Sequence, residues 1–304
     1  MIRLHIVASR LATLVTHRKH AFSTRTTLPS RSRDRDVGEL QNKIISIFQS
    51  NDADVTNQIN NLILNRTNRL STINVATILH RCSKNRVKIR ENSLSILSHQ
   101  LKISPDRFRS SDIGMAVYGL HQMSCENKSV LNLVDTISIK VEESNASISM
   151  EGAASALYGL KGMKCSTREV KRLLRSLINK IKTCRDPFSM RAINSSFCAF
   201  HNMTGESEEV RELLAILTEK LKSCPEPLNC KAISTVMYSL RRMNAESEEM
   251  RQLLRVLSTV IESSSENFDA SAVGQCIYGL QAMASDTPGT MILPESYPDQ
   301  SDMK

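Results

Sequence analysis

Apolar residues in the middle of this chain recur at helical spacing, in segments that alternate along the sequence. One segment has apolar positions 113, 116, 117, 120 and 123, and the next has 130, 133, 134, 137 and 141. Intervals of three and four residues place each set on one face of an α-helix, whereas a half-buried strand would alternate apolar and polar residues. The pattern therefore predicts pairs of amphipathic helices.

This pair of helices recurs every 40 residues. When the sequence is shifted by 40 on itself, a methionine aligns in every unit, and the register holds without insertion or deletion for about 170 residues. Self-similarity at a fixed period of this size is typical of helical repeat proteins. We predict an all-α fold, a right-handed α-solenoid of antiparallel helix pairs. The aligned methionines are Met123, Met163, Met203, Met243 and Met283.

Helix ends are marked by capping residues and prolines. Ser166 and Glu169 have the spacing of a capping box, which predicts that a second helix starts at Ser166. Pro187 and Pro227, 40 residues apart, fall between units, where a proline stops helix continuation.

Domain boundaries follow from the repeat. We expect an N-terminal helical cap over 38–69 and an α-solenoid over 70–283, followed by a polar, proline-containing, disordered tail over 284–304. The units are a degenerate one at 70–109, complete ones at 110–149, 150–189, 190–229 and 230–269, and a half repeat at 270–283. A solenoid normally ends in a polar capping helix. The half repeat therefore indicates either an atypical cap or a shortened form of a longer protein.

The N-terminal segment carries most of the net charge. Residues 1–33 contain seven Arg or Lys and no acid, out of a formal net charge of +9 for the whole chain. Such an amphipathic, acid-poor, Ser-rich segment is typical of an organellar transit peptide. We expect import into the mitochondrial matrix, with a plastid as the alternative and cleavage after Phe22. A merely disordered basic tail is the other reading of this segment.

Several classes of function are disfavoured by what the sequence lacks. No apolar run approaches the ~18 residues that a membrane span requires. The eight cysteines form no CxxC pair, so we expect reduced thiols and no metal site. No nucleotide-binding, zinc-protease or hydrolase motif is present. We therefore expect no enzyme activity, no cofactor and no small-molecule substrate.

The first helix of each unit has a face of small residues and a face of aromatic residues. Small residues at 119, 159, 199, 239 and 279 predict close approach of neighbouring helices. Four of the five tyrosines fall in one column of the other face, beside polar and basic side chains. The candidate RNA-binding residues are Tyr118, Tyr158, Tyr238, Tyr278, His121, Lys161, His201, Arg241, Gln281, Arg191 and Lys231.

Two interpretations of this aromatic face remain open. Regularly spaced rings with hydrogen-bond donors beside them suit an unpaired nucleic-acid strand, whose bases stack on aromatic side chains. Alternatively, the tyrosines pack between successive helices with their hydroxyls in water, and the basic side chains form a solvated face. RNA binding further requires basic charge on the first helices and acidic charge on the second, which the acidic starts of the later second helices suggest.

The stretch SALYGLKGM, followed by EVKRLLRSLINKI, resembles the octotricopeptide-type repeats and the helical repeats of organellar proteins that carry a RAP domain. The resemblance covers about 110–283. It implies an α-solenoid that binds single-stranded organellar RNA and supports its processing, stability or translation. The chain differs from the family in having tyrosine where the family has tryptophan, and we see no RAP domain after 283. The alternative is a protein-interaction scaffold of the HEAT or armadillo type, with a protein partner on its concave face.

Overall fold

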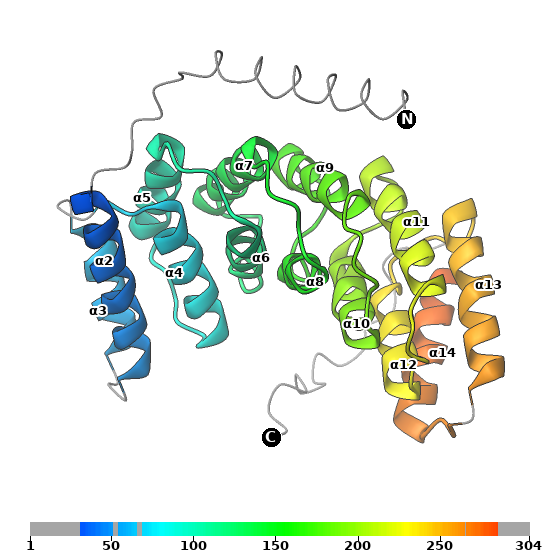
Figure 1. The fold of residues 1–304 in the computed structure, drawn as a ribbon. Helices are drawn as coiled ribbons and strands as arrows, with labels where there is room; N and C mark the ends of the chain where they lie inside the picture. Colours follow the sequence, from blue (N-terminus) through cyan, green and yellow to red (C-terminus); the bar gives the residue numbers. More distant parts are fainter. Residues whose placement is uncertain (1–30, 51–53, 66–68, 265, 285–304) are drawn as a thin grey trace, which may run out of the picture. The chain divides into compact units, whose positions relative to one another are not determined.

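The computed structural model describes residues 31–50, 54–65, 69–264 and 266–284 (Figure 1). Residues 1–38 and 39–304 form two units, and the helix pairs belong to the second. The expected transit peptide and tail fall almost entirely in 1–30 and 285–304, outside the described residues. All regular elements in the described ranges are helices, which confirms the all-α prediction. None of these helices is both long and apolar enough to span a membrane.

The described residues contain thirteen α-helices and one short 3₁₀ helix. Their bounds are α2 (Arg31–Gln49), α3 (Val55–Leu64), α4 (Thr72–Lys84), α5 (Glu91–Ile103), α6 (Ser110–Tyr118), α7 (Lys128–Glu143), α8 (Met150–Gly159), α9 (Arg168–Lys182), α10 (Met190–Phe197), η1 (Cys198–Asn202), α11 (Glu208–Lys222), α12 (Cys230–Ser239), α13 (Glu248–Ser263) and α14 (Ala270–Ala284).

Helices of the second unit pack in two rows (Figure 1). The even row consists of α4, α6, α8, α10, α12 and α14, each packed on the next. The odd row consists of α5, α7, α9, α11 and α13, packed in the same way, with α3 against α5. Each helix from α3 to α12 therefore contacts the helix two places further along the chain more extensively than the helix that follows it.

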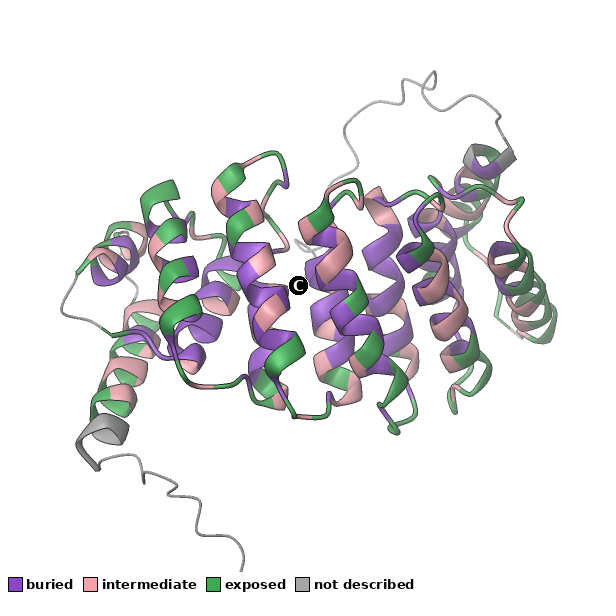
Figure 2. Ribbon diagram, turned by 90° about the horizontal axis from the view of Figure 1, so that it is seen from above, coloured by how far each residue is buried: buried purple, intermediate pink, exposed green. Residues whose placement is uncertain are grey.

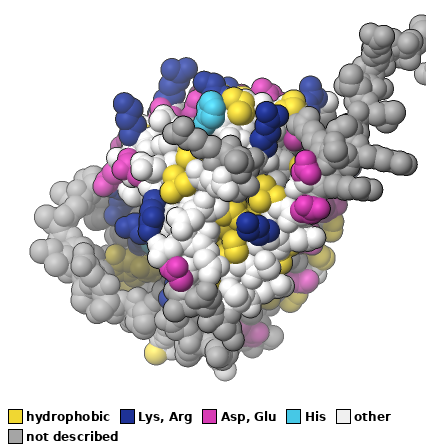
Figure 3. All heavy atoms as spheres, turned by 90° about the vertical axis from the view of Figure 1, so that its left-hand side faces the viewer, with side chains coloured by type: hydrophobic (Ala, Val, Ile, Leu, Met, Phe, Trp, Pro, Cys, Tyr) yellow, Lys and Arg dark blue, Asp and Glu magenta, His cyan; other side chains and the backbone are white. Residues whose placement is uncertain are grey.

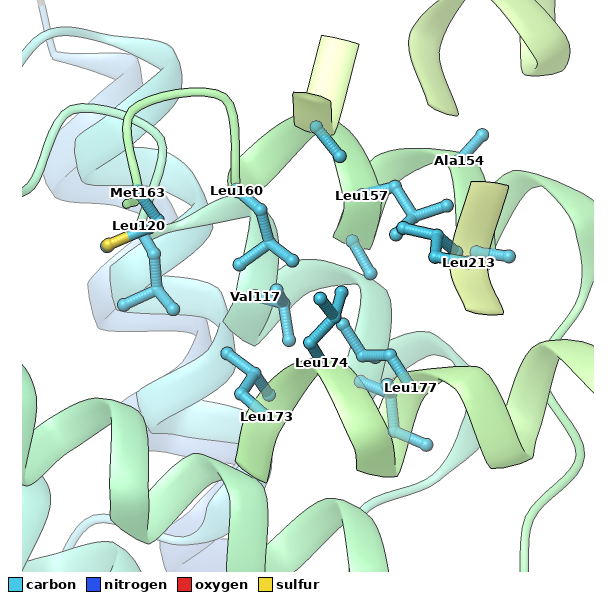
Figure 4. Packing of buried hydrophobic residues seen from close by; sticks show 14 of the residues in the cluster. Val117, Leu120, Ala154, Leu157, Leu160, Met163, Leu173, Leu174, Leu177 and Leu213 are labelled. Carbon is cyan, nitrogen blue, oxygen red and sulfur yellow. The ribbon is translucent and has the colours of Figure 1, made fainter. Parts of the chain in front are cut away.

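The apolar stripes read from the sequence form the core between the two rows. Val117 of α6, Leu160 at the end of α8 and Leu173 of α9 are fully buried, and Leu160 points toward Val117 in Figure 4. Buried residues lie on the facing sides of neighbouring helices, whereas exposed residues gather on the outer sides and in the loops (Figure 2). Burying one such side chain contributes roughly 1.5–3 kcal/mol relative to leaving it in water.

Helices α8, α10 and α12 of the even row begin with a side-chain cap. Ser149 accepts from the Gly152 amide at 3.2 Å, and Asn229 accepts from the Ala232 amide at 2.8 Å. A carboxylate from the next inter-unit loop accepts from the first amide of the helix, as Glu226 does from Met190 at 3.1 Å. Amides at a helix start have no partner within the helix, so these contacts satisfy them and tie each unit to the next.

One predicted helix start is wrong by one residue. The N-cap of α9 is Thr167, whose hydroxyl accepts from the Val170 amide, and the helix begins at Arg168. Ser166 is exposed and makes no capping bond. Thr167 has extended backbone angles, which let its side chain reach the third amide of the helix, so it takes the place of the predicted Ser166–Glu169 box.

Lysines of the odd row bind the end of the preceding odd-row helix. Lys140 Nζ donates to the Ser104 carbonyl at 2.8 Å, and Lys220 Nζ donates to the Cys184 carbonyl at 2.7 Å. Lys180 donates to the Ser144 carbonyl in the same way. Positive charge at the last carbonyls of a helix is favoured by the helix dipole, so these contacts set the spacing along the odd row.

Small residues of the even row allow close approach of neighbouring helices, as predicted. A Cβ added to Gly159 would lie 2.6 Å from the Cα of Tyr118, on backbone that cannot rotate away. A Cβ on Gly119 would lie 2.7 Å from the carbonyl carbon of Leu79. These contacts are far inside the usual separation of carbon atoms, so glycine is required at both places.

The core face of α14 differs from that of the other even-row helices. Val273, Ile277 and Leu280 are 40%, 57% and 47% exposed. Their counterparts 160 residues earlier, Ile113, Val117 and Leu120, are fully buried. Among the described residues, no helix covers this side of α14.

Candidate nucleic-acid interface

The four candidate tyrosines lie on the even row and contact one another in pairs. All four are half-buried. The rings of Tyr118 and Tyr158 are stacked, with centroids 5.9 Å apart and an interplanar angle of 16°. The rings of Tyr238 and Tyr278 lie 5.5 Å apart at 30°. In α10 and η1, between these pairs, the equivalent position holds Cys198, a buried thiol.

Histidines extend each pair of rings. His121 stacks on Tyr158 at 4.7 Å, and His80 contacts Tyr118 at 5.0 Å. His201 contacts Tyr238 at 5.6 Å. The structure thus brings the predicted tyrosines and histidines together into two aromatic columns. A base that stacked on every ring would have to displace a side-chain neighbour, because the rings already contact one another.

Cations cover two of the tyrosine rings. Lys161 Nζ lies 5.8 Å from the centroid of Tyr158, and Arg241 Cζ lies 4.7 Å from the centroid of Tyr238. A cation over an aromatic face is attracted to the ring by its quadrupole. These contacts hold Lys161 and Arg241 against the column instead of leaving them extended into solvent.

Arg241 also binds His201. Its Nη1 lies 2.8 Å from the Nδ1 of that ring. Burial, together with the positive charges of Arg241 and Lys161, lowers the pKa of His201 to about 3. His201 is therefore neutral near pH 7, and its Nδ1 accepts the hydrogen bond from the guanidinium.

Basic side chains outnumber acidic ones around the two columns. Arg191, Lys231 and Arg242 are exposed, and Gln281 is exposed near the end of α14. Glu151, at the start of α8, is an exposed carboxylate on the same helix faces. The expected acidic second row does not hold throughout, because α9 carries Arg168, Lys171, Arg172 and Arg175. Figure 3 shows the side of the molecule where α2 and α3 lie. Basic, acidic and apolar side chains are interspersed there.

A hollow of about 610 Å³ lies among α6, α8 and α10 beside the first column. Its lining includes two rings, two hydroxyls and two opposite charges, namely Tyr118, Tyr158, Ser155, Ser195, Glu151 and Arg191. Ala154 and Ala192 complete part of its wall, and both are buried. The volume lies within the range of about 300–1,000 Å³ typical of small-molecule sites.

A second hollow on the odd row is less suited to binding an anion. It is lined by Glu142 and the basic residues of α9. Arg172 donates to Glu142 at 2.6 and 3.0 Å and to Asp135 at 3.2 Å, and these bonds raise its pKa. Arg175 is paired with Glu209. Much of the positive charge at this hollow is therefore already matched by carboxylates.

One member of the first column could not be found from the sequence. His80 contacts Tyr118, yet a shift of 40 residues places Ile78, not a ring, at the tyrosine position of the degenerate unit. Ile78 is fully buried. Since the repeat pattern has faded in 70–109, no spacing signal distinguishes His80 from any other surface histidine.

Within the described ranges, no group of three or more His, Cys, Asp or Glu side chains is placed to hold a metal ion. No family model matches the sequence, and neither a curated protein nor a solved structure matches the chain.

Proposed function

We propose that this chain is a right-handed α-solenoid with a 40-residue period that binds single-stranded RNA inside an organelle. The observation that carries the proposal is the aromatic face of the even row, where tyrosine rings lie beside Lys161, Arg191 and Arg241. Single-stranded RNA is bound by positive grooves that follow its backbone and by aromatic side chains that stack its bases.

The repeat supports the solenoid part of the proposal. Caps and inter-unit bonds recur at fixed sequence spacing: the loop carboxylates that bind Met150, Met190 and Cys230 amides each lie 36 residues further on. The row-by-row packing also follows the sequence order of the helices. A stack of equivalent units presents equivalent side chains along one continuous wall, as binding to a polymer requires.

Localisation and role rest on the sequence. The basic, acid-poor segment 1–33 supports import into the mitochondrial matrix, with a plastid as the alternative destination. Fusion of 1–33 to a fluorescent protein tests this directly. Mitochondrial signal with an N-terminus generated after Phe22 supports the proposal, whereas diffuse fluorescence contradicts it. In the organelle, we propose that the protein supports RNA processing, stability or translation by binding rather than by catalysis.

The decisive experiment is ultraviolet crosslinking in organelle extract, with and without ribonuclease, followed by salt titration of the purified chain on oligo-RNA. We expect the logarithm of the binding constant to fall with the logarithm of salt concentration by about 0.7 per phosphate contact. Replacing Lys161, Lys231 and Arg242 by glutamine should weaken binding and reduce that slope by about 2, if each contacts one phosphate.

A matched triple variant controls for net charge. Lys102, Lys128 and Arg168 are exposed cations of the odd row. Their replacement by glutamine should leave the salt slope nearly unchanged. Equal losses in both triple variants would mean that RNA binding, if any, is not localised to the even row.

The ring-on-ring contacts favour a second candidate function, a protein-interaction scaffold. Tyrosines that pack between neighbouring helices stabilise a wall for a peptide or partner subunit without contacting nucleic acid. Recovery of a protein partner at high salt, with no RNA crosslink, would support the scaffold and contradict RNA binding.

A further inference from the structure

The hollow beside the first aromatic column is where the ring spacing changes along the even row. Tyr158 and Tyr238 stand on either side of the unit in which Cys198 takes the place of a tyrosine. On the α10 side of Tyr158, the outward positions hold Ser195 and Arg191, and both line the hollow. The side chain of Ser195 is small, so it leaves space beside Tyr158 in the wall of the hollow.

Two opposite charges line this hollow without neutralising each other. Glu151 and Arg191 are both exposed, and no ion pair joins them in the part of the chain that the structure describes. The α9 hollow differs, because Glu142 there is bonded to Arg172 at 2.6 Å. The even-row hollow therefore offers a carboxylate and a guanidinium together, with two tyrosine rings in the same wall.

Among the RNA bases, this set of groups matches guanine best. Guanine has two acceptors, O6 and N7, on one edge, and a guanidinium binds these two atoms in the commonest specific base contact. Its adjacent edge carries the N1–H and N2–H donors, which suit the two acceptor oxygens of a carboxylate. Adenine and cytosine present a donor beside an acceptor on the corresponding edge, and uracil lacks an amino group.

We propose that the hollow lined by Tyr118, Tyr158, Glu151 and Arg191 binds one unpaired guanine base of an RNA strand. The base lies against the tyrosine wall, Glu151 accepts from N1–H and N2–H, and Arg191 donates to O6 and N7. This inference rests on the proposed RNA-binding function and adds to it a single base-selective position. The hydroxyls of Ser155 and Ser195, which line the same hollow, are in place to bind the adjoining ribose.

The test measures binding of the purified full chain to a ten-residue oligouridylate and to the same strand with one central guanine, adenine, cytosine or inosine. We expect guanine to tighten binding about tenfold over uridine, the usual size of one good bidentate base contact. Inosine lacks the 2-amino group but keeps O6, N7 and N1–H, so it should lose only part of that gain. Adenine and cytosine should bind like uridine.

Glu151→Gln is the informative variant, because the carboxylate should weaken binding of the negatively charged strand but strengthen binding of guanine. Removing a negative charge should leave oligouridylate binding unchanged or tighter, while the preference for guanine becomes weaker, because only the Arg191 contact to O6 and N7 remains. Glu169→Gln is the matched control, since Glu169 lies in the first turn of α9 on the odd row. It should keep the guanine preference. Circular dichroism of both variants checks that the helices are intact.

The outcomes separate this inference from the proposed function. If oligouridylate binds with a steep salt dependence but guanine gives no gain, the base-selective hollow is wrong and RNA binding stands. A guanine preference that is undiminished in Glu151→Gln also overturns the inference. If no oligonucleotide binds, both fail. If guanosine monophosphate alone binds as tightly as the guanine-containing strand, the ligand is a free nucleotide and not RNA.

Discussion

Replacing Gly159 by alanine tests whether glycine sets the distance between α6 and α8. The added Cβ would lie 2.6 Å from the Cα of Tyr118 and from the carbonyl carbon of Val117. Carbon atoms pack at about 3.5–4.0 Å, so the two helices would have to separate by about 1 Å. Both obstructing atoms belong to the backbone, which means that no rotamer change relieves the clash.

The magnitude follows from two opposing terms. Overpacking a well-packed contact costs about 1–3 kcal/mol, and a clash with backbone belongs at the upper end. Alanine is better than glycine in a helix by about 1 kcal/mol. We therefore expect Gly159→Ala to lower the free energy of unfolding by about 2 kcal/mol. Gly274→Ala is the control, because a Cβ there meets nothing within 4 Å. It should raise stability by about 0.5–1 kcal/mol.

Urea unfolding followed by far-ultraviolet circular dichroism measures the sign and size of both changes. Repeat proteins lose cooperativity between distant units, so amide hydrogen exchange should accompany it and show faster exchange in α6 and α8 for Gly159→Ala. A urea midpoint for Gly159→Ala equal to or above that of the original chain would refute the reasoning. It would mean that the added Cβ does not clash with the backbone of α6.

Three further predictions concern burial and titration. Leu160→Ala, at a fully buried site, should lower the free energy of unfolding by about 2–5 kcal/mol in the same urea experiment. Leu280→Ala, at the equivalent site that is 47% exposed, should lower it by less than about 1.5 kcal/mol. Equal losses would mean that the α14 face is covered in solution. Burial and nearby cations lower the pKa of His201 to about 3 in the folded chain, whereas its ordinary pKa is 6.5. Between these pH values the unfolded chain binds a proton that the folded chain does not, so the free energy of unfolding should fall as the pH drops from about 6.5 toward 3. His201→Gln should reduce this pH dependence. Burial raises the pKa of the Cys82 thiol to about 12, whereas Cys224 is only partly buried. Iodoacetamide at pH 8 should therefore label Cys224 before Cys82, as measured by peptide mass spectrometry. Rapid labelling of Cys82 would contradict its burial.

The helices and their buried faces could be predicted from the sequence because burial imposes a period. Leu120, Leu157 and Leu173 occupy stripe positions and are all fully buried. The close approach at Gly159 was also predictable, since only a small residue is tolerated where two backbones meet. The cap of α9 was missed by one residue because Ser166 and Thr167 are both good capping residues, and only the backbone angles select Thr167.

The geometry of the aromatic face could not be predicted in the same way. A column of tyrosines in the sequence fixes which rings are neighbours, but not whether their faces meet each other or a ligand. That depends on helix separation and on side-chain rotamers, neither of which leaves a periodic signal. The pairing of Arg241 with His201 is of the same kind, because it joins two units through a 2.8 Å contact.

Close helix packing limits how an RNA strand could be read by this face. Gly159 brings α8 near enough to α6 for Tyr118 and Tyr158 to stack at 5.9 Å, so the rings of these two units contact each other. Reading one base in every unit requires an accessible ring in every unit, and this arrangement does not provide it. Beside the first column, a hollow with donors and acceptors lies among α6, α8 and α10. If the face binds RNA as proposed, base selection should be confined to few positions, and the cations of the even row should bind the backbone irrespective of sequence. The test is to substitute each base of a bound RNA strand in turn and to compare the losses in affinity. Equal losses at every position would contradict this interpretation of the face.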